Sequence, residues 1–206
     1  MAVYRSVWYG QFMPVKSPAP PKLSPRERLL AAADELFYEE GVNTVGIDRI
    51  IERAGVAKAS LYDAFGSKEE LVRSYLTARH EARQARLTTK LARYKTARDK
   101  LLGIFDVLDE SAADSTYRGC AFVRASAEAQ AGSSVRTVSS ETRAWFRSLL
   151  AGLAREAKAK QPDQLAEQLM MLYDGASVAA YMDGNKGAAM AARKVALMMV
   201  DAGCRK

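Results

Sequence analysis

The feature that most restricts the fold is a pair of short helical segments joined by a glycine turn, "GIDRIIERAGVAKASLYDAFGSKEE", residues 46–70. Gly55 suits the end of the first segment, and the second runs from Lys58 to about Phe65, before Gly66. A helix of about two turns is marginal alone in water, so neighbouring elements must hold it in place. Helix, glycine turn and short helix together form the helix-turn-helix arrangement.

The sequence after residue 66 also predicts helices, since it has no strand-like alternation and almost no internal proline before Pro162. Ser24 with Glu27, and Ser67 with Glu70, have the spacing of capping boxes at the starts of two helices. Outside the pair above, we expect helices over about 25–40, 67–93, 97–111, 120–129, 134–160, 162–184 and 186–202. The predicted fold class is therefore all-α.

Two faces are expected on the short helix. Val56, Leu61 and Phe65 have the spacing to anchor it in a small core, which leaves an outward face made of Lys58, Ala59, Ser60, Tyr62 and Asp63. A helix presented to DNA needs long donors for phosphate and small residues where the backbone approaches base edges. A plain connector in a helical bundle is the alternative.

Composition indicates a soluble protein with a basic middle. The chain of 206 residues carries a net charge of +7, and residues 67–104 hold ten Lys/Arg against four Asp/Glu. A basic excess is compatible with a nucleic-acid partner but does not require one. Arg79, Arg83, Arg86, Lys90 and Arg93 fall on one side of a helix, where they form either a solvated face or a source of long-range attraction to DNA.

The segment "LLAAADELFYEEGVNTVGIDRIIERAGVAKASLYDAFGSKEELV", residues 29–72, resembles the DNA-binding domain of the TetR/AcrR transcriptional regulators. The resemblance implies that the short helix enters the major groove. The proline-rich start of the chain predicts a disordered tail (1–23). The resemblance implies a three-helix helix-turn-helix domain (24–70) and a helical ligand-binding and dimerisation domain (71–206). Carried over by position, the implied DNA-binding residues are Thr44, Arg49, Lys58, Ala59, Ser60, Tyr62, Asp63 and Lys68.

The sequence departs from the usual family pattern in the short helix. Ala57 stands where a Ser or Thr often caps the helix, and Ala59 replaces a common glycine. Asp63 and Ala64 occupy a place where His, Tyr or Arg is often found. Operators of better-known members therefore do not predict the DNA sequence recognised by this chain.

Large aromatic and methionine side chains are spread over several helices of the second half, and the resemblance implies a cavity there whose filling releases DNA. Met and aromatic side chains accommodate varied apolar ligands, so we expect a small, mostly apolar effector. The lining predicted for this cavity is Phe105, Tyr117, Cys120, Phe122, Val123, Trp145, Phe146, Met170 and Tyr173.

The last two long helices are rich in apolar and small residues, which predicts close packing in a four-helix bundle made by two subunits. The expected partners are therefore a second copy of the chain and double-stranded DNA with a palindromic operator. The residues assigned to dimerisation are Leu165, Leu169, Leu172, Ala176, Val195 and Met198.

No catalytic, metal or cofactor site is expected. His80 is the single histidine, no His/Cys cluster has metal-ligand spacing, and no phosphate-binding glycine loop occurs. The sequence lacks a membrane span or a signal peptide, and Cys120 and Cys204 are isolated, which favours the cytoplasm. We therefore predict a ligand-released homodimeric repressor. The alternatives are a regulator that senses oxidation through Cys120, and a helical small-molecule-binding protein or enzyme that does not bind DNA.

Overall fold

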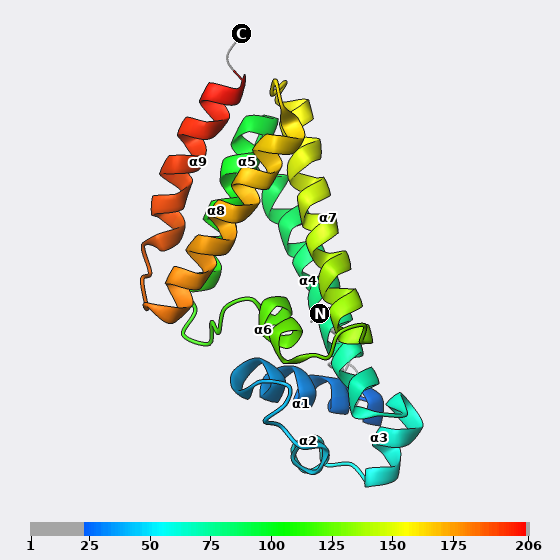
Figure 1. The fold of residues 1–206 in the computed structure, drawn as a ribbon. Helices are drawn as coiled ribbons and strands as arrows, with labels where there is room; N and C mark the ends of the chain where they lie inside the picture. The colour runs from blue at the N-terminus through cyan, green and yellow to red at the C-terminus, as the bar shows by residue number, and fades with distance from the viewer. Residues whose placement is uncertain (1–22, 205–206) are drawn as a thin grey trace, which may run out of the picture.

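The computed structural model describes residues 23–204, and this part of the chain forms nine α-helices and no strand (Figure 1). The prediction of an all-α fold is confirmed, and the observed ends differ from the predicted ones by a few residues. The predicted tail lies outside the described residues except for Leu23. The helices are α1 (Pro25–Glu40), α2 (Ile47–Ala54), α3 (Lys58–Phe65), α4 (Lys68–Leu91), α5 (Ala97–Ala112), α6 (Ala121–Glu128), α7 (Ser134–Glu156), α8 (Pro162–Met182) and α9 (Ala188–Cys204).

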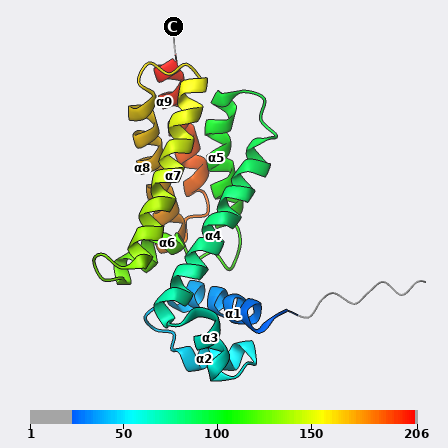
Figure 2. The ribbon, with the colours of Figure 1, turned by 90° about the vertical axis from the view of Figure 1, so that its right-hand side faces the viewer.

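The helices are arranged along one long axis. Helices α1, α2 and α3 form one end of the molecule, and the long helices α4 and α7 run from that end side by side (Figures 1 and 2). Helices α5, α8 and α9 pack together at the other end, where α8 lies between α7 and α9. Helix α4 therefore connects the helix-turn-helix end directly to the larger helical body.

The helix starts follow the predicted capping residues in part. At α1 the capping box is complete: the Glu27 amide donates to Ser24 Oγ (3.3 Å) and the Ser24 amide donates to Glu27 Oε2 (2.8 Å). At α4 only half of the predicted box forms. The Glu70 amide donates to Ser67 Oγ (3.1 Å), but the Glu70 carboxylate accepts from Arg73 Nε (2.7 Å) instead of returning to the cap.

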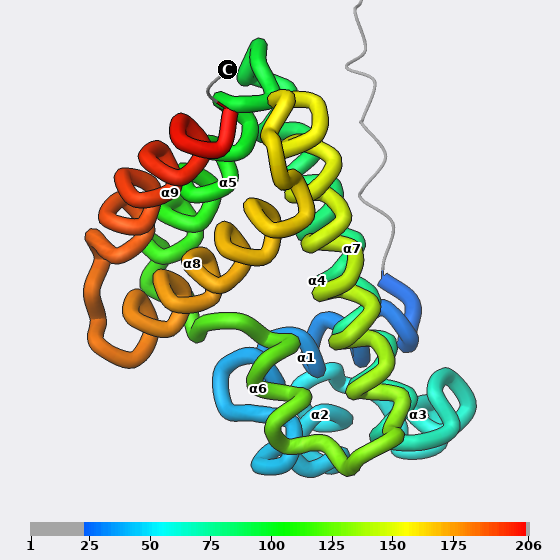
Figure 3. Tube along the Cα trace, turned by 45° about the horizontal axis from the view of Figure 1, so that its top comes forward, coloured from blue at the N-terminus to red at the C-terminus, as the bar shows by residue number. Residues whose placement is uncertain are grey.

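Two hydrophobic clusters divide the core. The first combines α1, α2, α3 and the start of α4 with α6 and Val135 at the start of α7. The second joins the rest of α4 to α5, α7, α8 and α9. Helix α6 thus packs on the helix-turn-helix end, next to α1 (Figure 3), although it comes after the boundary predicted at residue 70. That boundary remains a prediction.

Candidate nucleic-acid interface and ligand cavity

Helix α3 has the two faces that its sequence predicts. Leu61 is fully buried and Phe65 nearly so, which anchors the helix in the first cluster. Tyr62 is 45% exposed, and Lys58, Ala59 and Asp63 are exposed beside it, while Ser60 is half-buried. The predicted departure at Ala57 is visible as a helix start without a side-chain cap.

The turn between α2 and α3 is held from α1. Gly55 adopts a left-handed conformation (φ 62°), which favours glycine. Arg28 Nη1 donates to the carbonyl oxygens of Ala54 (3.1 Å) and Gly55 (3.0 Å), so one guanidinium fixes the turn. The sequence analysis missed Arg28, because nothing local in the sequence indicates that a residue 27 positions earlier reaches this turn.

Each exposed cation on α2 and at the start of α3 lies beside a carboxylate. Lys58 Nζ is 3.1 Å from Asp48 Oδ1, Arg49 makes two bonds to Glu40 (2.6 and 2.8 Å), and the shortest Arg53 bond to Glu35 is 2.7 Å. The hydrogen bond from Lys58 to Asp48 raises the pKa of Lys58, and the bond from Arg49 lowers the pKa of Glu40. These cations stay charged near neutral pH.

The other two predicted DNA-binding residues lie on either side of this surface. Thr44 is exposed in the turn before α2. Lys68 is half-buried at the first turn of α4, and this burial lowers the pKa of its ammonium group. Both fit an interface that includes α3, although the side chain of Lys68 is partly covered.

A cavity of about 750 Å³ lies between the two hydrophobic clusters, walled by α1, α4, α5, the segment before α6, and α8. Four residues of the predicted lining are in its wall: Tyr117, Cys120, Phe122 and Tyr173. The other five lie outside this wall, because α6 packs on the helix-turn-helix end and the cavity forms nearer α1, and their role in ligand binding stays a prediction. Phe105, Phe146 and Met170 belong to the second core cluster, Trp145 packs against that cluster, and Val123 is exposed.

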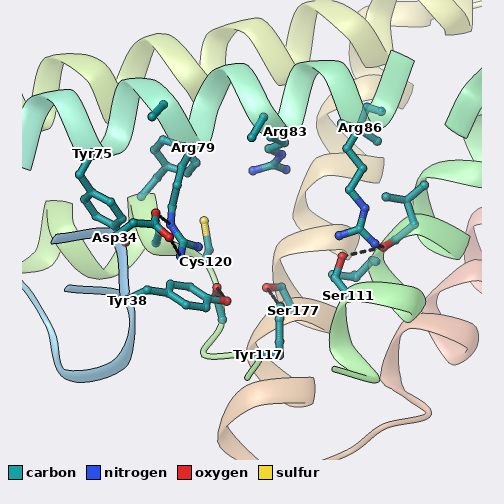
Figure 4. Close-up of a pocket in the computed structure, with 18 of the residues that line it drawn as sticks. Asp34, Tyr38, Tyr75, Arg79, Arg83, Arg86, Ser111, Tyr117, Cys120 and Ser177 are labelled. Atoms are coloured by element: carbon teal, nitrogen blue, oxygen red, sulfur yellow. Dashed lines mark hydrogen bonds and ion pairs between the residues drawn. The ribbon is translucent and has the colours of Figure 1, made fainter. Parts of the chain in front are cut away.

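The cavity wall contains three arginines from one side of α4 (Figure 4). Arg79 makes two bonds to Asp34 (2.6 and 3.0 Å), and Arg86 lies 3.5 Å from Glu110. The guanidinium of Arg83 lies over the rings of Phe146 (4.5 Å to the centroid) and Tyr173 (5.4 Å). The three arginines therefore line the cavity; Arg79 and Arg83 are half-buried and Arg86 is exposed, and the attraction of the stripe to DNA stays a prediction.

A neutral polar pair lies on another part of the wall. The hydroxyl groups of Tyr117 and Ser177 are 2.7 Å apart and share a hydrogen bond (Figure 4). Burial raises the pKa of Tyr117 to about 12, although its bond to Ser177 acts in the opposite direction. The phenol therefore stays protonated and remains able to donate a hydrogen bond.

Helix α1 is tied to the cavity wall through Tyr38. Its hydroxyl donates to the Gly119 carbonyl (3.1 Å) and accepts from the Arg118 amide (3.0 Å). Arg124 Nη1 donates to the Tyr38 carbonyl (2.7 Å), and Arg79 lies 3.7 Å from the centroid of the Tyr38 ring. These contacts connect the cavity wall directly to a helix of the helix-turn-helix end.

The predicted dimerisation residues divide into two groups. Leu165, Leu169 and Ala176 are buried, and Leu172 packs against the same core, so this face of α8 is covered by the chain's own helices. These four residues therefore contact the chain's own core, and their role in dimerisation stays a prediction. Val195 (40% exposed) and Met198 (63% exposed) do lie on the surface of α9.

A different apolar stripe on α8 accompanies Val195 and Met198. Met171, Gly175, Val178 and Met182 are exposed at helical spacing on α8. Ala191, Val195, Met198 and Ala202 repeat the same spacing on α9. The spacing of the α8 stripe was visible in the sequence, so this surface could have been chosen over the inner face.

Membrane spans, metal sites and cysteines were also considered in residues 23–204. No helix there is long and apolar enough to cross a membrane, and no group of three or more His, Cys, Asp or Glu is placed to hold a metal ion. Cys120 and Cys204 are free thiols, both half-buried. The anchored, exposed α3 behind its glycine turn defines the chain as a helix-turn-helix protein.

Comparison with known proteins agrees with this class. Residues 29–75 match the family described as bacterial regulatory proteins, tetR family. The transcriptional repressor NemR of Escherichia coli K12 is 32% identical over 105 residues, 50% of this chain and 53% of NemR. The activator FasR of Mycolicibacterium smegmatis is 47% identical over 51 residues, 25% of this chain and 23% of FasR. The chain thus spans about half the length of NemR and less of FasR.

Solved structures match over a longer range. A TetR-family transcriptional regulator from Streptomyces coelicolor superposes with a TM-score of 0.83 at 26% identity, covering 88% of this chain and 96% of that one. A regulator of the same type from Streptomyces avermitilis gives 0.80 at 29% identity, covering 89% and 100%. The family match, the curated relatives and these structures together support a TetR/AcrR family transcriptional regulator.

Proposed function

We propose that the protein is a homodimeric transcriptional repressor that binds a palindromic operator and is released by a small, mostly apolar effector. The observation that carries the proposal is the anchoring of α3, whose buried Leu61 and Phe65 leave Lys58 and Tyr62 on an exposed face. This face suits insertion into the major groove, with Thr44, Arg49, Ala59, Ser60, Asp63 and Lys68 around it.

In this proposal Lys58 and Arg49 exchange their carboxylate partners for DNA phosphates. Both ion pairs are solvent-exposed, and such pairs are worth about 0–1 kcal/mol, so separating them costs little. Phosphate contacts then release counterions and favour binding at low salt. Tyr62 supplies a hydroxyl for a phosphate or a ribose, and Ala59 offers a methyl group for a thymine methyl.

The exposed stripes of α8 and α9 are the proposed dimer interface. Isolated large apolar residues are common on protein surfaces, but two parallel stripes on adjacent helices are typical of a buried contact. A two-fold axis through them makes a four-helix bundle and presents two copies of α3 to DNA. Half-sites one DNA turn apart, about 34–36 Å, or a near multiple of this distance, are expected.

The dimer has its own test. A chain carrying Met171→Glu and Met198→Glu should sediment as a monomer with unchanged helicity, because both side chains are exposed in the single chain. The matched change on the inner face, Leu169→Ala, should instead destabilise the fold by about 2–5 kcal/mol. A wild-type chain that is monomeric at micromolar concentration would refute the interface.

The proposed release of DNA by the effector depends on the contacts between the cavity and α1. A ligand in the cavity touches Arg79, Tyr38 and the segment before α6, so its binding favours one position of α1 relative to α4. If DNA favours another separation of the two α3 helices, ligand and DNA compete through a population shift. A regulator of this kind acts where the chromosome lies, so the proposed location is the cytoplasm.

The proposed function is tested by fluorescence anisotropy with labelled DNA from directly upstream of the protein's own gene. We expect nanomolar-range binding that weakens as salt rises, with competition by unlabelled upstream DNA and not by a scrambled duplex. Equal affinity for both duplexes would contradict specific operator recognition, and no affinity for either would favour a helical protein that uses the cavity without binding DNA.

Cys120 supports a second candidate trigger, since this free thiol lines the same cavity. Alkylation with N-ethylmaleimide fills part of the cavity and, if thiol modification is the signal, lowers DNA affinity in the wild type but not in Cys120→Ser. Unchanged DNA affinity after complete alkylation would remove this candidate.

A further inference from the structure

The charge on Arg83 has no partner among residues 23–204. Arg79 is bound to Asp34, and Arg86 shares Glu110 with Lys90. Arg83 makes neither an ion pair nor a hydrogen bond with the described part of the chain, and its contacts are with the rings of Phe146 and Tyr173. These ring contacts use none of the five N–H donors of the guanidinium in a hydrogen bond to an oxygen acceptor.

The carboxylates in the cavity wall do not compensate this charge. The wall has two of them, Glu27 and Asp34. The Glu27 carboxylate accepts from the amide and hydroxyl of Ser24, and Asp34 holds Arg79. The cavity therefore has one cation in excess, on a half-buried side chain. A half-buried cation without a carboxylate partner is available to pair with an anion that enters the cavity.

The position of Arg83 suits a ligand with one charged end. In Figure 4 Arg83 extends from α4 into the cavity, between Arg79 and Arg86 and across from the Tyr117–Ser177 pair. The remaining wall is mainly apolar, with Leu30, Leu87, Val107, Leu108 and Phe122. The wall thus combines one free planar cation, a neutral hydroxyl pair and a large apolar surface.

We propose that the effector is an organic carboxylate with an apolar body, whose anionic group pairs with Arg83. A guanidinium binds a carboxylate through two parallel hydrogen bonds, and the apolar wall covers the rest of such a molecule. A phosphate dianion fits less well, because Arg79 and Arg86 already have carboxylate partners and one free cation does not balance two charges. The inference rests on the proposed function, since it names the ligand class for the same cavity.

The test compares 2-naphthoate with 2-naphthamide, and decanoate with decanamide, which differ in charge but little in shape. Isothermal titration calorimetry on the full chain should show that each carboxylate binds at least about tenfold more tightly than its neutral amide. Arg83→Met should remove this preference without weakening amide binding, and Arg83→Lys should retain part of it. The control Arg73→Met, an exposed arginine on the same helix outside the cavity wall, should behave as the wild type.

Equal binding of carboxylate and amide by the wild type, binding of neither pair, or a preference that survives Arg83→Met would overturn the inference. The comparison of carboxylate and amide binding by the wild type needs no variant. It therefore tests the inference even if Arg83→Met fails to fold. DNA binding is measured separately. Carboxylate binding without operator binding would leave the ligand site intact and reject the proposed function, whereas operator binding without carboxylate binding would reject this inference alone.

Discussion

The cations of the α2–α3 surface and Arg83 of the cavity wall differ in their partners. On the α2–α3 surface, Lys58, Arg49 and Arg53 are exposed and each is next to a carboxylate. In the cavity, Arg79 and Arg86 are paired, but Arg83 is half-buried and has only aromatic rings as partners in the described chain. Exposed pairs separate at little cost when a polyanion arrives, whereas an unpaired, half-buried cation favours one small anion.

The difference separates two kinds of recognition in one chain. The surface pairs suit DNA, where many weak phosphate contacts add up and salt opposes all of them. The cavity suits a ligand bound through one strong, directional contact inside an apolar wall. Variants that change the α2–α3 surface without the cavity, or the cavity without the surface, therefore test whether the two regions recognise different ligands.

The largest expected effect is on DNA affinity in Lys58→Ala. A dimer loses two charge-assisted phosphate contacts, so affinity should fall about a hundredfold. The slope of log affinity against log salt should become shallower by about one unit per subunit. Anisotropy at several salt concentrations measures both. Arg155→Ala, which breaks an exposed pair with Asp163 at the far end of the molecule, is the matched control and should change neither.

The second effect is on stability in Asp34→Asn. This change leaves Arg79 without its carboxylate in the cavity wall, so we expect the free energy of unfolding to fall by about 1–3 kcal/mol. Urea denaturation measures the loss. Asp163→Asn removes a more exposed pair and should cost less than about 1 kcal/mol, and equal losses in the two variants would contradict the distinction between cavity and surface.

The smallest effect is on the pKa of His80. Burial lowers this pKa below its usual value near 6.5, and the nearby charge of Arg83 lowers it further, while Glu81 and Glu141 act in the opposite direction. The unfolded chain therefore takes up this proton at higher pH than the folded chain, and stability falls as the pH drops below about 7. Replacing His80 by Gln should remove this component.

His80 also reports on the cavity. An anion paired with Arg83 cancels one cause of the shift, so binding of 2-naphthoate should raise the pKa of His80. The chain has one histidine, so a single imidazole signal followed by NMR titration gives the value. The same pKa with and without bound naphthoate would show that the anion is not next to Arg83.

The sequence predicted local structure better than long-range contacts. Every helix was expected, because caps, glycines and apolar spacing act within a few residues. The faces of α3 followed from the positions of Leu61 and Phe65. The Arg28 contact with the turn after α2 could not be derived, because it joins residues 26 and 27 positions apart.

The cavity shows most clearly which contacts could not be predicted from the sequence. Tyr117, Cys120, Phe122 and Tyr173 were predicted, but Arg79, Arg83 and Arg86 were interpreted as surface charges. Their spacing placed them on one side of α4, and only the packing of α1, α5 and α8 turns that side inward. Likewise, α8 carries two apolar faces, and the sequence does not decide which of them the chain covers with its own helices.

The most direct test of the central claim is to add 2-naphthoate to a preformed complex of the protein with its upstream DNA, and to follow anisotropy for wild type and Arg83→Met. The account predicts that both proteins bind the DNA with equal affinity, that naphthoate releases the wild type, and that at least about tenfold more is needed to release the variant. Release of both proteins at the same concentration, or loss of DNA binding in Arg83→Met before any ligand is added, would contradict it.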